Sequence, residues 1–151
     1  MSDLRELYQQ VILDHNKNPR NFGKLEGANR VQEGHNPLCG DHLHVYLYLS
    51  DDQIIEDIRF EGSGCAISKA SASLMSSTLK GKSADHAHEV FDRFHALVTA
   101  GEDKTVDLEK MGKLAVFSGV RDFPTRVKCA TLAWHTMKAA LEEGDSTITT
   151  E

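Results

Sequence analysis

Residues 42–49 read HLHVYLYL, and every second one of them is aliphatic. Because successive side chains of a strand point to opposite faces, this alternation predicts a strand with one buried face and one open face. The next residues, SDD at 50–52, favour a turn, and residues 53–60 carry the apolar side chains of a second strand. Residues 42–60 therefore predict an antiparallel hairpin.

The sequence on either side of this hairpin has the period of helices. Apolar side chains recur every three or four residues near the N-terminus and again after the hairpin, which is typical of helices with one buried face. The first helix is expected to bury Leu4, Leu7, Tyr8, Val11 and Ile12. The later helices are expected over residues 66–80, 84–100, 107–117 and 126–143.

The order of these elements predicts the fold class. Residues 24–33 show little pattern, and residues 34–41, GHNPLCGD, are rich in turn formers and are predicted to form a loop. Helix, strands and then helices indicate an α+β fold, with a small antiparallel β-sheet of about three strands and helices packed on one face. The 151 residues fit a single domain, 1–151, in which residues 145–151 are expected to be a frayed tail.

The overall composition limits the partners and the location. The chain is 40% hydrophobic and 26% charged, which is typical of a globular protein. Its net charge of −6 argues against nucleic acid as a main partner, because phosphate binding requires a basic patch. No apolar run approaches the ~18–20 residues of a membrane span, and the acidic, polar N-terminus is unlike a signal peptide. We therefore expect a cytoplasmic protein with no nucleic-acid and no membrane partner.

The three cysteines occupy unusual positions for structural thiols. An odd number of cysteines in a reducing compartment argues against a disulfide framework. Cys39 lies in the predicted loop, two residues before Asp41, and Cys65 follows two glycines at the start of a predicted helix. A helix N-terminus favours a thiolate through its free N–H groups and its dipole. Three buried, inert thiols are the alternative reading.

Cys129 is predicted to lie in the first turn of the last helix, after Arg126 and Lys128, whose charges also favour a thiolate. Three thiolates and the carboxylate of Asp41 form a set suited to tetrahedral zinc or to iron–sulfur chemistry. Long gaps separate the cysteines, and they form no Cys-x-x-Cys pair. Three histidines near the first cysteine offer alternatives to Asp41 as a ligand: His35, His42 and His44.

Three short motifs resemble one known superfamily. NPLCGD at 36–41, GSGCAIS at 62–68 and RVKC at 126–129 resemble, in this order, the cysteine motifs of U-type iron–sulfur cluster assembly proteins. That superfamily includes IscU, the N-terminal domain of NifU, and SufU, and the resemblance covers nearly the whole chain. Lysine in place of histidine at position 128, before the third cysteine, and Arg126 resemble the SufU branch. The implied fold is the SufE/NifU-like one.

The resemblance implies a site, a cofactor and partners. A zinc ion would be held by Cys39, Asp41, Cys65 and Cys129. Cys39, on the loop, would accept persulfide sulfur, and Arg126 and Lys128 would supply electrostatic support. The implied partners are a SufS-like, PLP-dependent cysteine desulfurase and downstream Fe–S scaffold proteins. Such a protein would be at most a sulfurtransferase-type partner of the desulfurase, so the sequence leaves open whether it is itself an enzyme.

Two other functions remain open at this stage. In the first, the chain is an IscU-type scaffold, on which a [2Fe–2S] cluster is assembled by the same residues and then transferred. In the second, the chain is a structural zinc module that acts only in protein contacts, and its closed zinc site only stabilises the fold, as many three-cysteine sites do.

Overall fold

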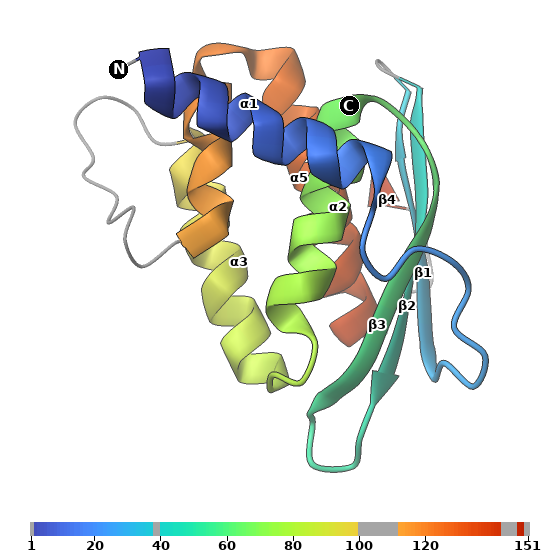
Figure 1. Cartoon of the computed structure of the whole chain (residues 1–151). Coiled ribbons are helices and arrows are strands. Elements are labelled where there is room, and N and C mark those ends of the chain that lie inside the picture. Colours follow the sequence, from blue (N-terminus) through green and yellow to red (C-terminus); the bar gives the residue numbers. More distant parts are fainter. Residues whose placement is uncertain (1, 38–39, 100–111, 143–147, 150–151) are drawn as a thin grey trace.

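The computed structural model describes residues 2–37, 40–99, 112–142 and 148–149. A mixed sheet forms one layer, and the helices pack against one of its faces, as Figure 1 shows with the sheet nearly edge-on. The strand order is β3-β2-β1-β4. This arrangement confirms the predicted α+β fold with a three-stranded antiparallel sheet, to which a short fourth strand is added.

The strands have the register of a continuous antiparallel meander. β1 pairs with β2, and β2 pairs with β3, all antiparallel, while β4 pairs parallel with β1. Their bounds are β1 Arg30–Asn36, β2 Asp41–Leu49, β3 Ile55–Ser63 and β4 Ile148–Thr149. β4 belongs to the stretch 145–151, which was predicted to be a frayed tail, and its pairing with β1 differs from that prediction. The rest of this stretch, 145–147 and 150–151, lies outside the described residues.

β1 was not predicted, because residues 34–41 were expected to form a loop. Its inward side chains are Gln32 and Asn36, which are polar but buried, so the strand lacks the apolar alternation that marks β2. Between them, Gly34 faces α5, and a Cβ atom there would lie 2.0 Å from Thr136 Oγ1. A polar, glycine-containing strand is therefore held by close packing rather than by an apolar face.

The helices largely agree with the prediction in place and in length. They are α1 Ser2–Lys17, α2 Ala66–Leu79, α3 Ala84–Thr99, the 3₁₀ helix η1 Gly112–Asp122, and α5 Pro124–Leu141. The short helix expected over 107–117 is this 3₁₀ segment, which begins later; residues 107–111 lie outside the described part. Leu7 was expected on the buried face of α1, but 53% of it is exposed. In the described residues, no helix is long and apolar enough to cross a membrane.

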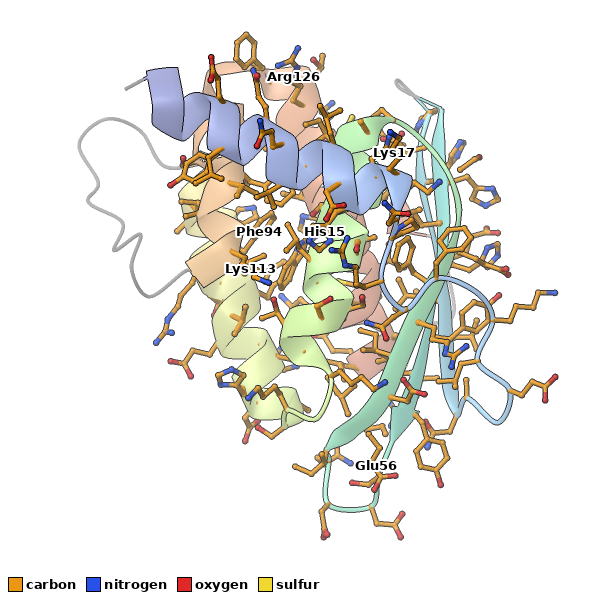
Figure 2. All side chains as sticks on the ribbon, viewed as in Figure 1. His15, Lys17, Glu56, Phe94, Lys113 and Arg126 are labelled. Carbon is orange, nitrogen blue, oxygen red and sulfur yellow. The ribbon has the colours of Figure 1, made fainter. Side chains whose placement is uncertain are left out.

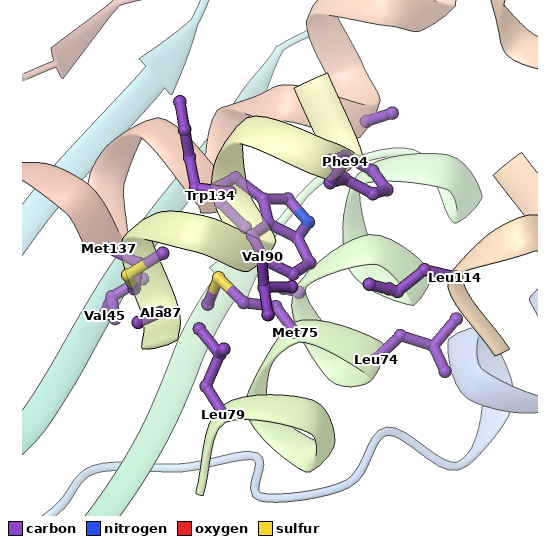
Figure 3. Packing of buried hydrophobic residues seen from close by; sticks show 14 of the residues in the cluster. Val45, Leu74, Met75, Leu79, Ala87, Val90, Phe94, Leu114, Trp134 and Met137 are labelled. Atoms are coloured by element: carbon purple, nitrogen blue, oxygen red, sulfur yellow. The ribbon is translucent and has the colours of Figure 1, made fainter. Parts of the chain in front are cut away.

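The hydrophobic core lies between the helices and the inner face of the sheet (Figure 3). Trp134 of α5 is fully buried and stacks on Phe94 of α3, with ring centroids 4.6 Å apart. The indole Nε1 donates a hydrogen bond to Ser71 Oγ of α2, and Ser71 Oγ donates in turn to the carbonyl oxygen of Ala130. This relay fixes α2 against α5, the two helices that carry Cys65 and Cys129.

Candidate metal centre

Three predicted ligand residues, far apart in the sequence, meet where the sheet adjoins α2 and α5. Asp41 is the first residue of β2, Cys65 is the N-cap of α2, and Cys129 lies in α5. One carboxylate oxygen and the two Sγ atoms all lie within 4.8 Å of one another. Asp41 and Cys129 are buried, and Cys65 is half-buried. The fourth predicted ligand, Cys39, lies outside the described residues.

Hydrogen bonds fix Asp41 and Cys65 relative to each other. The backbone N–H of Cys65 donates to Asp41 Oδ1 at 2.8 Å, and Cys65 Sγ lies 3.9 Å from Asp41 Oδ2. At the start of α2, the backbone N–H of Ser68 donates to Cys65 Sγ at 3.4 Å. This cap places the sulfur among free helix N–H groups, as predicted, and such donors favour a thiolate.

The approach between these elements requires glycine at position 64. A Cβ atom there would lie 2.6 Å from Asp41 Oδ1, which is closer than real side-chain contacts allow. The first glycine of the motif, Gly62, has φ of +137°, and a Cβ there would lie 2.0 Å from the carbonyl oxygen of His42. The glycines before Cys65 thus let the end of β3 and the start of α2 approach the beginning of β2 closely.

Cys129 has a different environment from the one predicted. α5 begins at Pro124, so Cys129 is its sixth residue and lies beyond the first turn. The prediction of a first-turn thiol was therefore wrong, because proline favours the first helical position and starts the helix earlier. The sulfur is buried against β1, where the side-chain amide of Asn36 donates to it at 3.6 Å.

Asn36 is a site residue that sequence reasoning missed. Its Nδ2 lies 3.4 Å from Asp41 Oδ2 as well as 3.6 Å from Cys129 Sγ, so one amide group donates to both. The side chain is fully buried, and among the described residues no group donates a hydrogen bond to its Oδ1. A buried donor aimed at two potential anions is suited to holding metal ligands in place. The only sequence signal for this role is that the asparagine lies three residues before Cys39. That stretch was expected to be a loop, so no buried side chain was predicted there.

The other two predicted residues, Arg126 and Lys128, lie on the same helix as Cys129. Arg126 is exposed and lies over the ring of Phe123, with its Cζ atom 4.6 Å from the centroid, near the start of α5 (Figure 2). Lys128 is half-buried one residue before Cys129. Their electrostatic role stays a prediction.

The histidines weighed as substitutes for Asp41 lie on the opposite face of the sheet. Strand β2 alternates from its first residue, with Asp41 buried and His42 exposed. His44 follows on the same outer face, and His35 of β1 stands opposite His42 in the register. The geometry therefore brings the aspartate, and none of these imidazoles, to the two sulfurs.

The sequence matches the NifU-like N terminal domain over residues 7–130, which is most of the chain. The chain belongs to this family. It is 43% identical over 146 residues to the zinc-dependent sulfurtransferase SufU of Bacillus subtilis (strain 168), covering 95% of this chain and 96% of that one. It is also 39% identical over 142 residues to the iron–sulfur cluster assembly scaffold protein IscU of Streptococcus pyogenes serotype M1, covering 94% and 87%.

The fold of this family member agrees with a solved structure. A crystal structure described as an iron–sulfur cluster assembly scaffold protein for the SUF system, from Fervidobacterium islandicum AW-1, superposes with a TM-score of 0.81. The two chains are 36% identical, and the match covers 91% of this chain and 98% of that one. The superfamily suggested by the three cysteine motifs is thereby confirmed, and both the sulfurtransferase and the scaffold branch are among its relatives.

Proposed function

We propose that this chain is a zinc-dependent sulfur acceptor for a cysteine desulfurase in iron–sulfur cluster assembly. The observation that carries the proposal is the convergence of Asp41, Cys65 and Cys129, held together by backbone and amide donors. The similarity to the Bacillus subtilis sulfurtransferase supports it.

The donor set fits zinc in its chemistry. Thiolate sulfur and carboxylate oxygen are ligands that zinc accepts in a tetrahedral arrangement, and three such atoms lie within 4.8 Å of one another. Cys39, two residues before Asp41, is proposed as the fourth ligand. When bound, zinc keeps the cysteines deprotonated at neutral pH, because a coordinating thiol loses its proton. With four anionic ligands the loaded site carries a net charge of −2, which the cations Arg126 and Lys128 partly offset.

We assign the sulfur transfer step to Cys39. Its thiolate attacks the outer sulfur of the persulfide on the desulfurase, forming a new S–S bond on Cys39. The S–S bond of the desulfurase breaks, and its cysteine leaves as a thiolate, so no external oxidant or reductant is consumed. During the exchange, the Cys65 and Cys129 sulfurs and the Asp41 carboxylate stay in place, because the start of β2, the cap of α2 and the buried turn of α5 fix them.

The partners follow from this chemistry. The donor is a SufS-like cysteine desulfurase, which uses its own PLP to mobilise sulfur from cysteine, and the acceptors are downstream Fe–S scaffold proteins. The reaction belongs in the cytoplasm, where thiols stay reduced.

The first test is the rate of alanine release from cysteine by the desulfurase. Zinc-loaded protein is expected to stimulate this rate, and mass spectrometry is expected to find one added sulfur on Cys39. Cys39→Ser should abolish both effects while the circular dichroism spectrum is retained. Ser77→Ala, a helix-face hydroxyl outside the cluster, is the matched control. Normal sulfur acceptance by the Cys39→Ser protein would show that the assignment of Cys39 is wrong.

The scaffold function is the second candidate, and the similarity to the Streptococcus pyogenes IscU favours it. The same residues would ligate a [2Fe–2S] cluster. Anaerobic reconstitution with ferrous iron and sulfide distinguishes the two. A stable cluster that transfers to an apoprotein, without zinc-dependent stimulation of the desulfurase, would favour the scaffold over the sulfur acceptor.

A further inference from the structure

A second group of metal-ligand side chains lies on the outer face of the sheet, away from the cysteines. Successive residues of β2 alternate, so His42 and His44 share the face that the helices leave uncovered. The register sets Glu33 of β1 directly opposite His44 and sets His35 opposite His42. Two adjacent strands therefore gather three imidazoles and one carboxylate on a single patch.

The side chains converge on one carboxylate oxygen. Glu33 Oε2 lies 2.9 Å from His42 Nε2 and 3.1 Å from His44 Nε2. One ligand atom from each of the three residues lies within 4.8 Å of the other two. The ring of His35 stands beside them, its centroid 5.5 Å from that of His42. A pair of imidazoles two residues apart on a strand, with a carboxylate between their Nε2 atoms, can close on a single cation.

Beside this arrangement, Tyr46 and Glu61 pair with each other. The ring of Tyr46 stacks beside His44, with centroids 6.4 Å apart, and its hydroxyl donates to Glu61 of β3. Glu61 stands opposite His44 in the register of β2 and β3, and its carboxylate accepts the hydrogen bond from Tyr46.

The patch is open to an incoming ion. The side chains of Glu33, His42 and His44 are 37%, 48% and 36% exposed. Nitrogen and oxygen ligands of this kind suit divalent first-row transition metals, and two histidines with one carboxylate leave positions for water or a further ligand.

We propose that Glu33, His42 and His44 form a second metal site, which binds one divalent transition-metal ion such as Zn²⁺ on the outer face of the sheet. The site shares no ligand with the cysteine cluster and lies on the opposite face of β2. Its existence is independent of the sulfur-acceptor function, so either proposal can fail while the other stands.

The test is a calorimetric titration of Zn²⁺ into full-length protein already loaded with one equivalent of zinc and freed of excess. We expect one further equivalent to bind, and the imidazole Nε2 resonances of His42 and His44 to shift in nitrogen-15 spectra. Because loss of a supporting outer-shell partner alone costs a metal site about 10–100-fold in affinity, removing a ligand should cost at least about tenfold. We therefore expect a loss of at least that factor in the affinity for the second equivalent of zinc in each of three variants: His42→Gln, His44→Gln and Glu33→Gln.

The matched control uses the other pair of histidines spaced by two residues. His86 and His88 lie on α3, and positions two apart on a helix do not face each other. The double variant His86→Gln/His88→Gln should leave the second equivalent unchanged. Absence of a second equivalent in the parent protein would overturn the proposal, as would its undiminished binding in His42→Gln/His44→Gln. The binding of the first equivalent of zinc and the acceptance of sulfur are measured in the same variants, and both should be unchanged.

Discussion

Replacing Asn36 with alanine tests whether the buried amide holds the metal ligands. The substitution removes one donor that serves both Asp41 and Cys129. Each hydrogen bond to a charged group contributes about 1.5–3 kcal/mol. Since both contacts are long, 3.4 Å and 3.6 Å, we assign that range to the whole side chain. At about 1.4 kcal/mol for each factor of ten, zinc affinity should fall about 10–100-fold, which agrees with measured outer-shell effects.

The assay is competition for zinc with a chromophoric chelator, together with urea unfolding of the metal-free protein. Asn29→Ala is the control, because Asn29 also makes two hydrogen bonds, to the backbone of Leu49 at the far end of the same sheet. That variant should lose stability but keep its zinc affinity. Zinc binding by Asn36→Ala within about twofold of the parent, or an equal loss in Asn29→Ala, would refute the reasoning.

Two other predictions concern packing at the site and the effect of pH. Gly64→Ala should weaken zinc binding, because its Cβ would displace the carboxylate of Asp41. Gly119→Ala is the control and should not weaken zinc binding, because there is open space around Gly119. The same chelator competition compares the two variants. Burial lowers the pKa of His135 from its ordinary 6.5. As the pH falls, His135 is therefore protonated in the unfolded chain before it is protonated in the folded protein. The free energy of unfolding should therefore decrease as pH falls below about 6.5, and His135→Gln should flatten this decrease in urea midpoints measured between about pH 7.5 and about pH 5.5. A pH dependence unchanged by the substitution would contradict this explanation.

The sequence predicted those elements whose buried face is apolar. β2 was predictable because each inward position from Leu43 to Leu49 is aliphatic. α3 was predictable for the same reason, and at its start the N–H of His86 donates a hydrogen bond to Ser83 Oγ. In such segments the local pattern and the tertiary packing require the same residues.

The sequence failed where the buried face is polar or where packing reverses a local preference. β1 buries the polar side chains of Gln32 and Asn36, of which Asn36 contacts the site, so the strand lacks the apolar alternation that would predict it. Leu7 fits the helical stripe of α1, but more than half of it is exposed, so the apolar spacing alone did not identify the buried face. The motifs indicated which residues belong to the cysteine cluster. Their distances, and the amide between them, depend on strand register, which no spacing along the chain specifies.

The two ligand groups differ in ways that set the order in which zinc should fill them. Asp41 and Cys129 are buried, and their group offers cysteine sulfurs, which as thiolates are soft ligands suited to zinc. The outer group of Glu33, His42 and His44 has no sulfur and is open to water, so its ion exchanges more easily. Because Asp41 and His42 are adjacent on one strand yet face opposite sides, both sites can be filled without sharing a ligand. The first equivalent of zinc should therefore occupy the cysteine cluster, and only ions beyond it should reach the histidines.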